Sequence, residues 1–278
     1  EMSVVSILIT IVQMILVLTI YLILSQSFGN LITALGAPVE KMILFWFLGS
    51  AAIFLSLRRI AWLEFLITAG MIAIILLIFV FGLQNWETFE TVAFATDWGK
   101  FLLPLGPVLF ALSGRVAIPL VMKFGSVARK AIVWGTIIPA VIYAFFIVSV
   151  LLLSPQVTED AVSGLVGSIP IWGLVIMGIL GILSLLSSYI TVGFDVYKSL
   201  ELDLRFPRWM RFLLIIFGPL ALYFAGFTNF IELVGFVGGV FLALEGILIV
   251  WMWLKAGGKK ISAPTAALVI VFLAALAY

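Results

Sequence analysis

Long runs of apolar residues, separated by short polar breaks, fill almost the whole chain. A sliding window of about 19 residues finds nine apolar segments, roughly at 3–28, 40–57, 60–83, 101–123, 129–154, 169–198, 209–226, 229–254 and 262–278. Most approach the ~20 residues that a helix needs to cross a bilayer, whereas the strands of a membrane barrel are shorter and alternate. The pattern predicts an all-α integral membrane protein with about nine transmembrane helices and no separate soluble domain.

Composition supports this class and excludes several kinds of chemistry. Of the 278 residues 65% are hydrophobic and 10% charged, against about a quarter charged in soluble domains. The chain has no cysteine and no histidine, which excludes disulfides, thiol chemistry, zinc sites built on these residues and histidine acid–base catalysis. No paired catalytic residues or metal cluster stand out. We therefore expect neither an enzyme nor a cofactor nor a bound metal.

Charged residues are distributed unequally between alternate loops. One side receives only Lys41 and Lys100, together with six of the 13 acidic residues. The positive-inside rule therefore predicts that the first segment starts in the cytoplasm and the last ends outside, in a multi-pass protein of the cytoplasmic membrane. We expect lipid but no nucleic acid as a partner, and a monomer. The other side holds twelve of the 15 basic residues: Arg58, Arg59, Lys123, Arg129, Lys130, Lys198, Arg205, Arg208, Arg211, Lys255, Lys259 and Lys260.

The fourth segment contains several helix-breaking residues and a charge. Its central stretch reads "GPVLFALSGRVAIP", with Pro107 and Pro119 near its ends and Arg115 inside. Proline removes a backbone donor, and glycine beside serine lowers helix propensity further. The stretch predicts a helix interrupted near Leu112–Gly114, facing a cavity or water, rather than a simple proline kink. Arg115 is then expected just past the break, where it pairs with an acid as an inner gate or caps carbonyls.

The sixth segment places four hydroxyl groups at helical spacing. Ser184, Ser187, Ser188 and Thr191 recur at i, i+3, i+4 and i+7, so they share one face. Such a face suits either a small cation such as Na⁺ or ordinary contacts between helices. Spacing alone leaves these two interpretations open.

Four acidic residues lie within or next to the apolar segments, at different expected depths. Asp195, one turn beyond the hydroxyl face, is a candidate for half of an inner gate, or a solvated end charge. Glu245 lies mid-segment and is a candidate proton relay, because a carboxyl at that depth is protonated or paired. Glu64 and Glu232 are placed nearer to the membrane interface. "GFVGGV", residues 235–240, permits close helix approach or local unwinding, and plain packing is favoured there.

Two stretches carry a resemblance to a known family. "PVLFALSGRVAIPLV" resembles the sixth helix of the amino acid/auxin permease family, within the APC superfamily and closest to its hydroxy- and aromatic-amino-acid branch. "SSYITVGFDVYKSLELDLRFPR" resembles the eighth helix of that family. The resemblance implies a LeuT-type fold with five-plus-five inverted repeats. Residues 1–83 would then be the last three helices of the first repeat, 101–254 the second repeat and 262–278 a peripheral helix, with two family helices expected before residue 1.

The resemblance also implies a function and assigns residues to it. Ala111, Leu112, Ser113 and Gly114 would line the substrate pocket, and Ser187 and Ser188 match positions that bind the ion in sodium-coupled relatives. Arg115 departs from the branch pattern. We therefore expect an ion-coupled symporter of amino acids working by alternating access, with Na⁺ or H⁺ as coupling ion. The alternatives are a transporter of the same fold for a nucleobase, polyamine or metal ion, and a non-transporting membrane scaffold.

Overall fold

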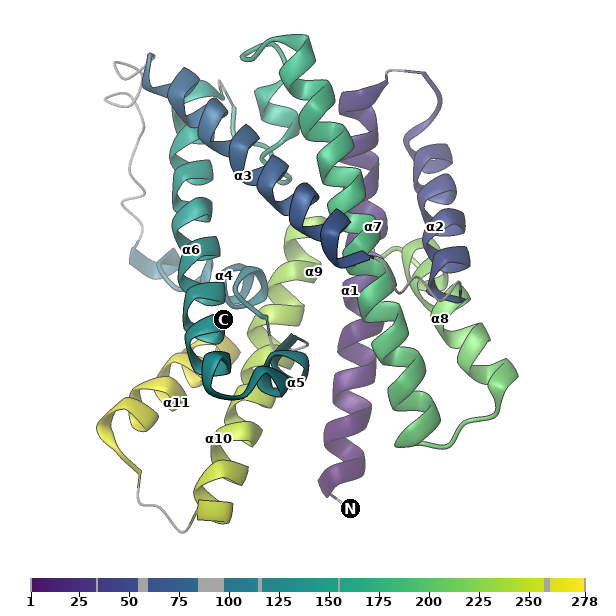
Figure 1. The fold of residues 1–278 in the computed structure, drawn as a ribbon, viewed down its shortest axis with the longest axis vertical. Helices are drawn as coiled ribbons and strands as arrows, with labels where there is room; N and C mark the ends of the chain where they lie inside the picture. The colour runs from purple at the N-terminus through teal and green to yellow at the C-terminus, as the bar shows by residue number, and fades with distance from the viewer. Residues whose placement is uncertain are drawn as a thin grey trace. The chain divides into compact units, whose positions relative to one another are not determined.

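Helices make up the regular structure of the chain. The computed structural model describes residues 2–33, 35–54, 60–84, 98–114, 117–154, 156–257 and 261–277. Among these residues the β-structure is limited to one isolated bridge between Val166 and Ile169. The α-helices (Figure 1) are α1 (Met2–Ile32), α2 (Pro38–Phe54), α3 (Ile60–Leu83), α4 (Leu105–Ala111), α5 (Ile118–Val121), α6 (Ala128–Leu153), α7 (Ile171–Leu202), α8 (Arg208–Phe224), α9 (Phe230–Phe236), α10 (Ala243–Gly257) and α11 (Ala263–Leu276).

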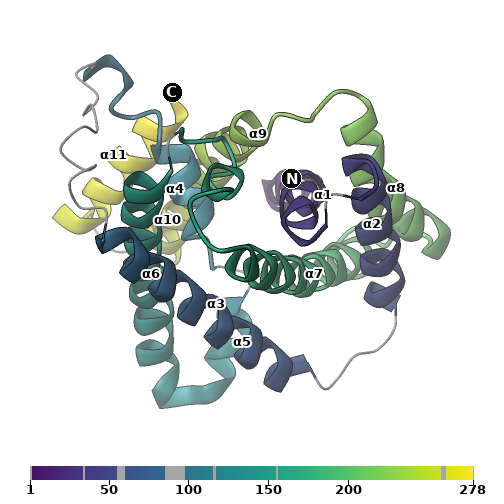
Figure 2. The ribbon, with the colours of Figure 1, turned by 90° about the horizontal axis from the view of Figure 1, so that it is seen from above.

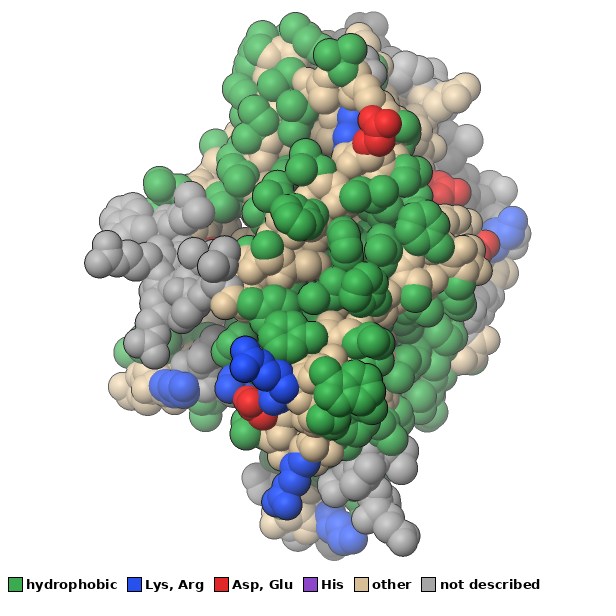
Figure 3. Space-filling model, turned by 90° about the vertical axis from the view of Figure 1, so that its right-hand side faces the viewer, with side chains coloured by type: hydrophobic (Ala, Val, Ile, Leu, Met, Phe, Trp, Pro, Cys, Tyr) green, Lys and Arg blue, Asp and Glu red, His purple; other side chains and the backbone are tan. Residues whose placement is uncertain are grey.

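Each of the nine apolar segments contains one or two of these helices, and the helical class predicted from the sequence is confirmed. Among the residues that the structure describes, five helical stretches are long and apolar enough to cross a membrane. The helices α2 and α8 have 17 residues each and α11 has 14. Hydrophobic side chains cover most of the face drawn in Figure 3, where charged side chains are few. The chain is therefore a membrane-embedded helical protein. The five stretches are Ser6–Ile32, Glu64–Leu83, Met122–Leu153, Ile171–Leu202 and Phe230–Gly257.

The helices group into two compact units. The first unit comprises residues 1–20, 95–113 and 196–278, and the second comprises residues 21–94 and 114–195. The long helices α1 and α7 contribute residues to both. These units do not follow the boundaries of the two predicted repeats, so the inverted-repeat arrangement stays a prediction.

In the first unit, α4 packs against the long helical stretch formed by α9, a π-helical turn η6 (Val237–Leu242) and α10. The helix α11 lies beside α10, as Figures 1 and 2 show. Their contact depends on a missing side chain, because a Cβ on Gly246 would lie 2.5 Å from Cζ of Phe272. The buried Thr19 hydroxyl of α1 is satisfied by the carbonyl of Ile15 at 3.0 Å.

In the second unit, α3 and α6 pack together, with the rings of Phe79 and Phe145 4.9 Å apart. The second part of α1 lies close against α7: a Cβ on Gly181 would lie 2.3 Å from Cδ1 of Phe28. Small residues allow this approach between helices without a hydrophobic driving force in lipid. The fully buried Tyr189 of α7 stacks edge-on against Phe45 of α2 at 5.5 Å.

Candidate functional site

The break predicted in the fourth apolar segment is confirmed. The helix α4 ends at Ala111, and its C-cap residue Leu112 has φ −94° and ψ 2°. Ser113 and Gly114 have no regular structure, and α5 begins at Ile118. A proline kink would have left one continuous helix, so the interruption is a true break. Arg115 lies outside the described residues, and its predicted gate role stays a prediction.

The residues of the break are accessible. Ala111, Ser113 and Gly114 are exposed and Leu112 is half-buried. A Cβ placed on Gly114 meets no atom within 4 Å, so the chain has open space there. Ala111, Leu112 and Ser113 belong to the first unit and Gly114 opens the second. Three of the four predicted substrate-binding residues, Ala111, Ser113 and Gly114, are therefore small and exposed at an interrupted helix.

Glycines fix the first half of the broken helix against its neighbour. A Cβ on Gly106 of α4 would lie 2.6 Å from the carbonyl oxygen of Gly235, and one on Gly238 would lie 1.8 Å from the carbonyl oxygen of Gly106. The π-helical turn η6 begins at Val237, within the same contact. Turns of this kind are rare and occur frequently at functional sites. The glycine run thus provides close packing, as favoured from the sequence, together with a local change of helix geometry.

The four hydroxyl groups on α7 have different partners. The Ser187 hydroxyl donates to Oε1 of Glu64 at 2.8 Å. The Ser188 side chain lies beside the Tyr21 hydroxyl of α1. Thr191 donates back to the carbonyl of Ser187 at 3.0 Å, which is an ordinary bond within a helix. Ser184 is half-buried one turn earlier. Thr191 is thus satisfied within its own helix, and the ion-coupling role of the four hydroxyl groups stays a prediction.

Glu64 has a bond partner that the sequence did not indicate. It stands in the second turn of α3, and the order of apolar residues assigns it to the membrane interface. The bond with Ser187 puts its carboxylate against the middle of α7, which α3 crosses at an angle (Figure 1), and the depth of Glu64 in the membrane stays a prediction. A tilt between two helices leaves no signal in the sequence, although a carboxyl inside an apolar run is itself a reason for attention.

The remaining acidic candidates lie in different units. Asp195 is half-buried near the end of α7 and is the last residue of the second unit. Glu245 lies in the first turn of α10, directly after η6, and its Oε2 atom is buried. No pairing between these two groups, or of either with Arg115, follows from the described residues. Their assignment as gate or proton relay stays a prediction.

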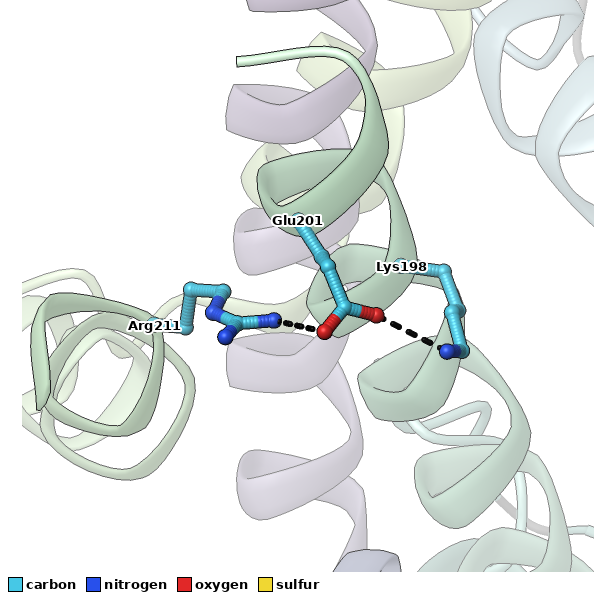
Figure 4. A network of polar contacts seen from close by, with 3 residues as sticks. All are labelled: Lys198, Glu201 and Arg211. Carbon is cyan, nitrogen blue, oxygen red and sulfur yellow. Dashed lines mark hydrogen bonds and ion pairs between the residues drawn. The ribbon is translucent and has the colours of Figure 1, made fainter. Parts of the chain in front are cut away.

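An ion-pair cluster lies at the end of α7 that is predicted to be cytoplasmic (Figure 4). Glu201 is paired with Lys198 at 2.8 Å and with Arg211 of α8. Arg211 is only 9% exposed, and its guanidinium group lies 4.6 Å from the centre of the Tyr197 ring. The cluster joins α7 to α8 inside the first unit. The sequence indicated only that these cations belong to one side of the membrane.

A turn between α6 and α7 is organised around Asp160. Its carboxylate accepts bonds from the Thr158 hydroxyl at 2.8 Å, the Ser163 hydroxyl at 2.6 Å and the Ser163 backbone N–H at 3.1 Å. Partial burial by itself raises the pKa of this carboxyl. The hydrogen bonds from Ser163, Ser27 and Thr158 outweigh burial and hold the pKa below its ordinary value. Asp160 is thus ionised and ties this loop, predicted to be external, to α1.

Comparisons of the chain with protein-family models, with curated proteins and with solved structures give no match.

Proposed function

We propose that the chain is an ion-coupled secondary transporter of amino acids in the cytoplasmic membrane. The observation that carries the proposal is the interrupted helix α4–α5 inside a membrane-embedded chain, with exposed small residues at the break. Irregular backbone at membrane depth is tolerated where it is covered by protein or lines a water-filled cavity. Discontinuous helices of this kind form the substrate sites of many secondary transporters. The likeness of this stretch to the amino acid/auxin permeases supports an amino acid as the solute.

In this proposal the substrate binds against Ala111, Leu112, Ser113 and Gly114. The chain adopts the LeuT-type fold with about nine membrane crossings and works as a monomer by alternating access. The ion binds along α7, with Ser184, Ser187, Ser188 and Thr191 as candidate ligands. If the ion binds the outward-open state more tightly, that difference in affinity couples ion and substrate. Arg115, Asp195 and Glu245 are the candidates for the inner gate or a proton relay.

Uptake by the purified protein in liposomes tests the function. We expect one or a few of the twenty amino acids to accumulate, and the accumulation to require an inward gradient of Na⁺ or H⁺. Thermal-shift measurements with the same amino acids give a second readout, which reports binding and does not require transport driven by an ion gradient. A screen in which no amino acid is taken up and none shifts the melting temperature contradicts the proposal. It would favour another solute or a non-transporting scaffold.

A substitution at the break links uptake to the site. Gly114→Leu places a side chain into open space, so the protein should fold while substrate is excluded. The matched control is Gly135→Leu on the exposed surface of α6, where a Cβ likewise meets no atom within 4 Å. We expect Gly114→Leu to lower uptake at least about tenfold, equivalent to about 1.4 kcal/mol of lost binding, and Gly135→Leu to leave it unchanged.

A further inference from the structure

The turn between α7 and α8 carries two arginines that no acidic side chain neutralises. The stretch from Lys198 to Arg211 holds four basic residues and two acidic ones. One of the acids, Glu201, is shared between Lys198 and Arg211 (Figure 4). Arg205 and Arg208 are exposed, and among the described residues neither of them is paired with an acid. The turn therefore keeps an excess of positive charge that its own side chains do not compensate.

Both arginines stand at positions that are locally unfavourable for them. The backbone of Arg205 has φ 52°, in the left-handed region that is uncommon and costly for a residue with a long side chain. Arg208 lies in the first turn of α8, where the helix dipole disfavours a cation, and no acidic residue shares that turn. The stability of the turn therefore does not explain these two charges, and an anionic partner from outside the protein would.

The turn lies at the polar ends of two apolar helices. The stretch Ile171–Leu202 is long and apolar enough to cross a membrane, and it ends three residues before Arg205. From Phe212 to Phe224 the rest of α8 contains no charged residue. The two helices and the turn between them can be followed in Figure 1. Basic residues directly beside an apolar helix are where proteins bind the headgroups of anionic lipids.

An exposed apolar face begins beside the arginines. Trp209, Leu213 and Phe217 recur at i, i+4 and i+8, so they share one face of α8, and all three are exposed. On the adjoining face the guanidinium group of Arg208 lies 5.4 Å from the centre of the Phe212 ring. A soluble anion would use the charges and leave the apolar face uncovered. A molecule that is anionic at one end and apolar along its length fits both, which favours a lipid.

We propose that Arg205 and Arg208 bind the headgroup of an anionic phospholipid. One of its acyl chains lies along the face formed by Trp209, Leu213 and Phe217. Guanidinium groups suit this role, because their planar donors form paired hydrogen bonds with phosphate oxygens. The inference concerns a lipid site and does not depend on whether the protein transports a solute.

Lipid binding is measured on the purified protein in an uncharged detergent, by adding phosphatidylglycerol at constant ionic strength and following the melting temperature. We expect a saturable rise that weakens as salt is added, since salt screens exposed charges. Phosphatidylcholine with the same acyl chains should raise the melting temperature far less, because its headgroup has no net charge. Glycerol phosphate, which offers the anion without acyl chains, should have little effect and separates a lipid from a free anion.

A double variant and a matched control locate the site. Arg205→Gln combined with Arg208→Gln should raise the phosphatidylglycerol concentration for half of the effect at least about tenfold. The control is Arg129→Gln combined with Lys130→Gln, which removes two exposed charges from the start of α6, predicted on the same side of the membrane. It should leave the response unchanged. Equal losses in the two double variants would show attraction by general charge and overturn the inference.

Further variants separate binding from folding. Asparagine tolerates the left-handed region better than arginine does, so Arg205→Asn should keep or raise the melting temperature without lipid and weaken the response about threefold. Leu213→Ala combined with Phe217→Ala reduces the apolar face and should also weaken it about threefold. Its control is Ile270→Ala combined with Leu273→Ala, at exposed apolar positions of α11.

Three results would overturn the inference. The first is a rise in melting temperature that is equal for phosphatidylglycerol and phosphatidylcholine. The second is an equal rise with glycerol phosphate, since a free anion would then be the ligand. The third is a response to phosphatidylglycerol that is unchanged in the variants of the arginines or of the apolar face.

Discussion

The backbones of Gly106 in α4 and Gly238 in η6 are in direct contact, so closely that a Cβ on Gly238 would lie 1.8 Å from the Gly106 carbonyl oxygen. Real Cβ atoms do not approach a backbone oxygen to this distance, so neither helix accepts a side chain there. This crossing holds the first half of the broken helix in place. The contact predicts that substitutions at Gly235 and Gly238, which lie within one helical turn of each other, have different effects on stability.

Gly238→Ala should destabilise the protein, because the added methyl group forces backbone apart rather than displacing a flexible side chain. Overpacking costs about 1–3 kcal/mol or more. Gly235→Ala, one turn earlier, adds a Cβ that meets no atom within 4 Å. It should be neutral or slightly stabilising, since alanine favours helix over glycine by up to about 1 kcal/mol. Melting temperatures in detergent compare the two, and equal losses would contradict the crossing.

Glu201→Gln should lower the melting temperature by removing the partner of a buried cation. Arg211 is 9% exposed and paired with Glu201, and a buried charge left without its partner is costly. Lys198→Ala should cost much less, because its side chain is 45% exposed and surface pairs contribute little. Asp203→Asn, an exposed acid nearby, serves as the control. A larger loss in Lys198→Ala than in Glu201→Gln would refute this ranking.

The turn around Asp160 should open in acid. Because the folded-state pKa of Asp160 lies below its ordinary value of 3.8, the unfolded turn binds a proton more readily than the folded one. The stabilisation is therefore fully present above that ordinary value and is lost as the pH falls through the lower folded-state pKa. Hydrogen exchange of the Ser163 amide between pH 7 and pH 3 measures it. Asp160→Asn should show fast exchange at every pH, whereas Glu159→Gln should behave as the unmodified protein.

Ser188→Ala should weaken the ion dependence of uptake, because it removes one of the candidate ion ligands on α7, beside the Tyr21 hydroxyl. Tyr21→Phe removes the other half of the same pair. The two changes should be non-additive when combined, as expected for groups in direct contact. Initial uptake rates against Na⁺ concentration and against pH provide the measurement. An unchanged response to both ions in Ser188→Ala would remove this residue from the ion site.

The local features of the protein follow from its sequence. The nine apolar segments agree with the observed helices because burial of apolar groups in lipid depends on composition along about twenty residues. The break at Leu112–Gly114 is equally local, since proline and glycine act on the backbone within a turn of themselves. Candidate residues on one helix, such as Ser184, Ser187, Ser188 and Thr191, share a face by periodicity alone.

Only the tertiary structure decided which of these groups meet. Ser187 and Glu64 are 123 positions apart, and their bond depends on the angle at which α3 crosses α7. The contact of Gly106 with Gly238 and the pairing of Arg211 with Glu201 depend in the same way on how helices pack. Hydrophobicity along a helix fixes that it enters the membrane and leaves its tilt and rotation undetermined, because every lipid-facing orientation of an apolar helix is nearly equal in energy. Packing between helices removes that degeneracy, so the contact of Glu64 with Ser187 is a property of the fold.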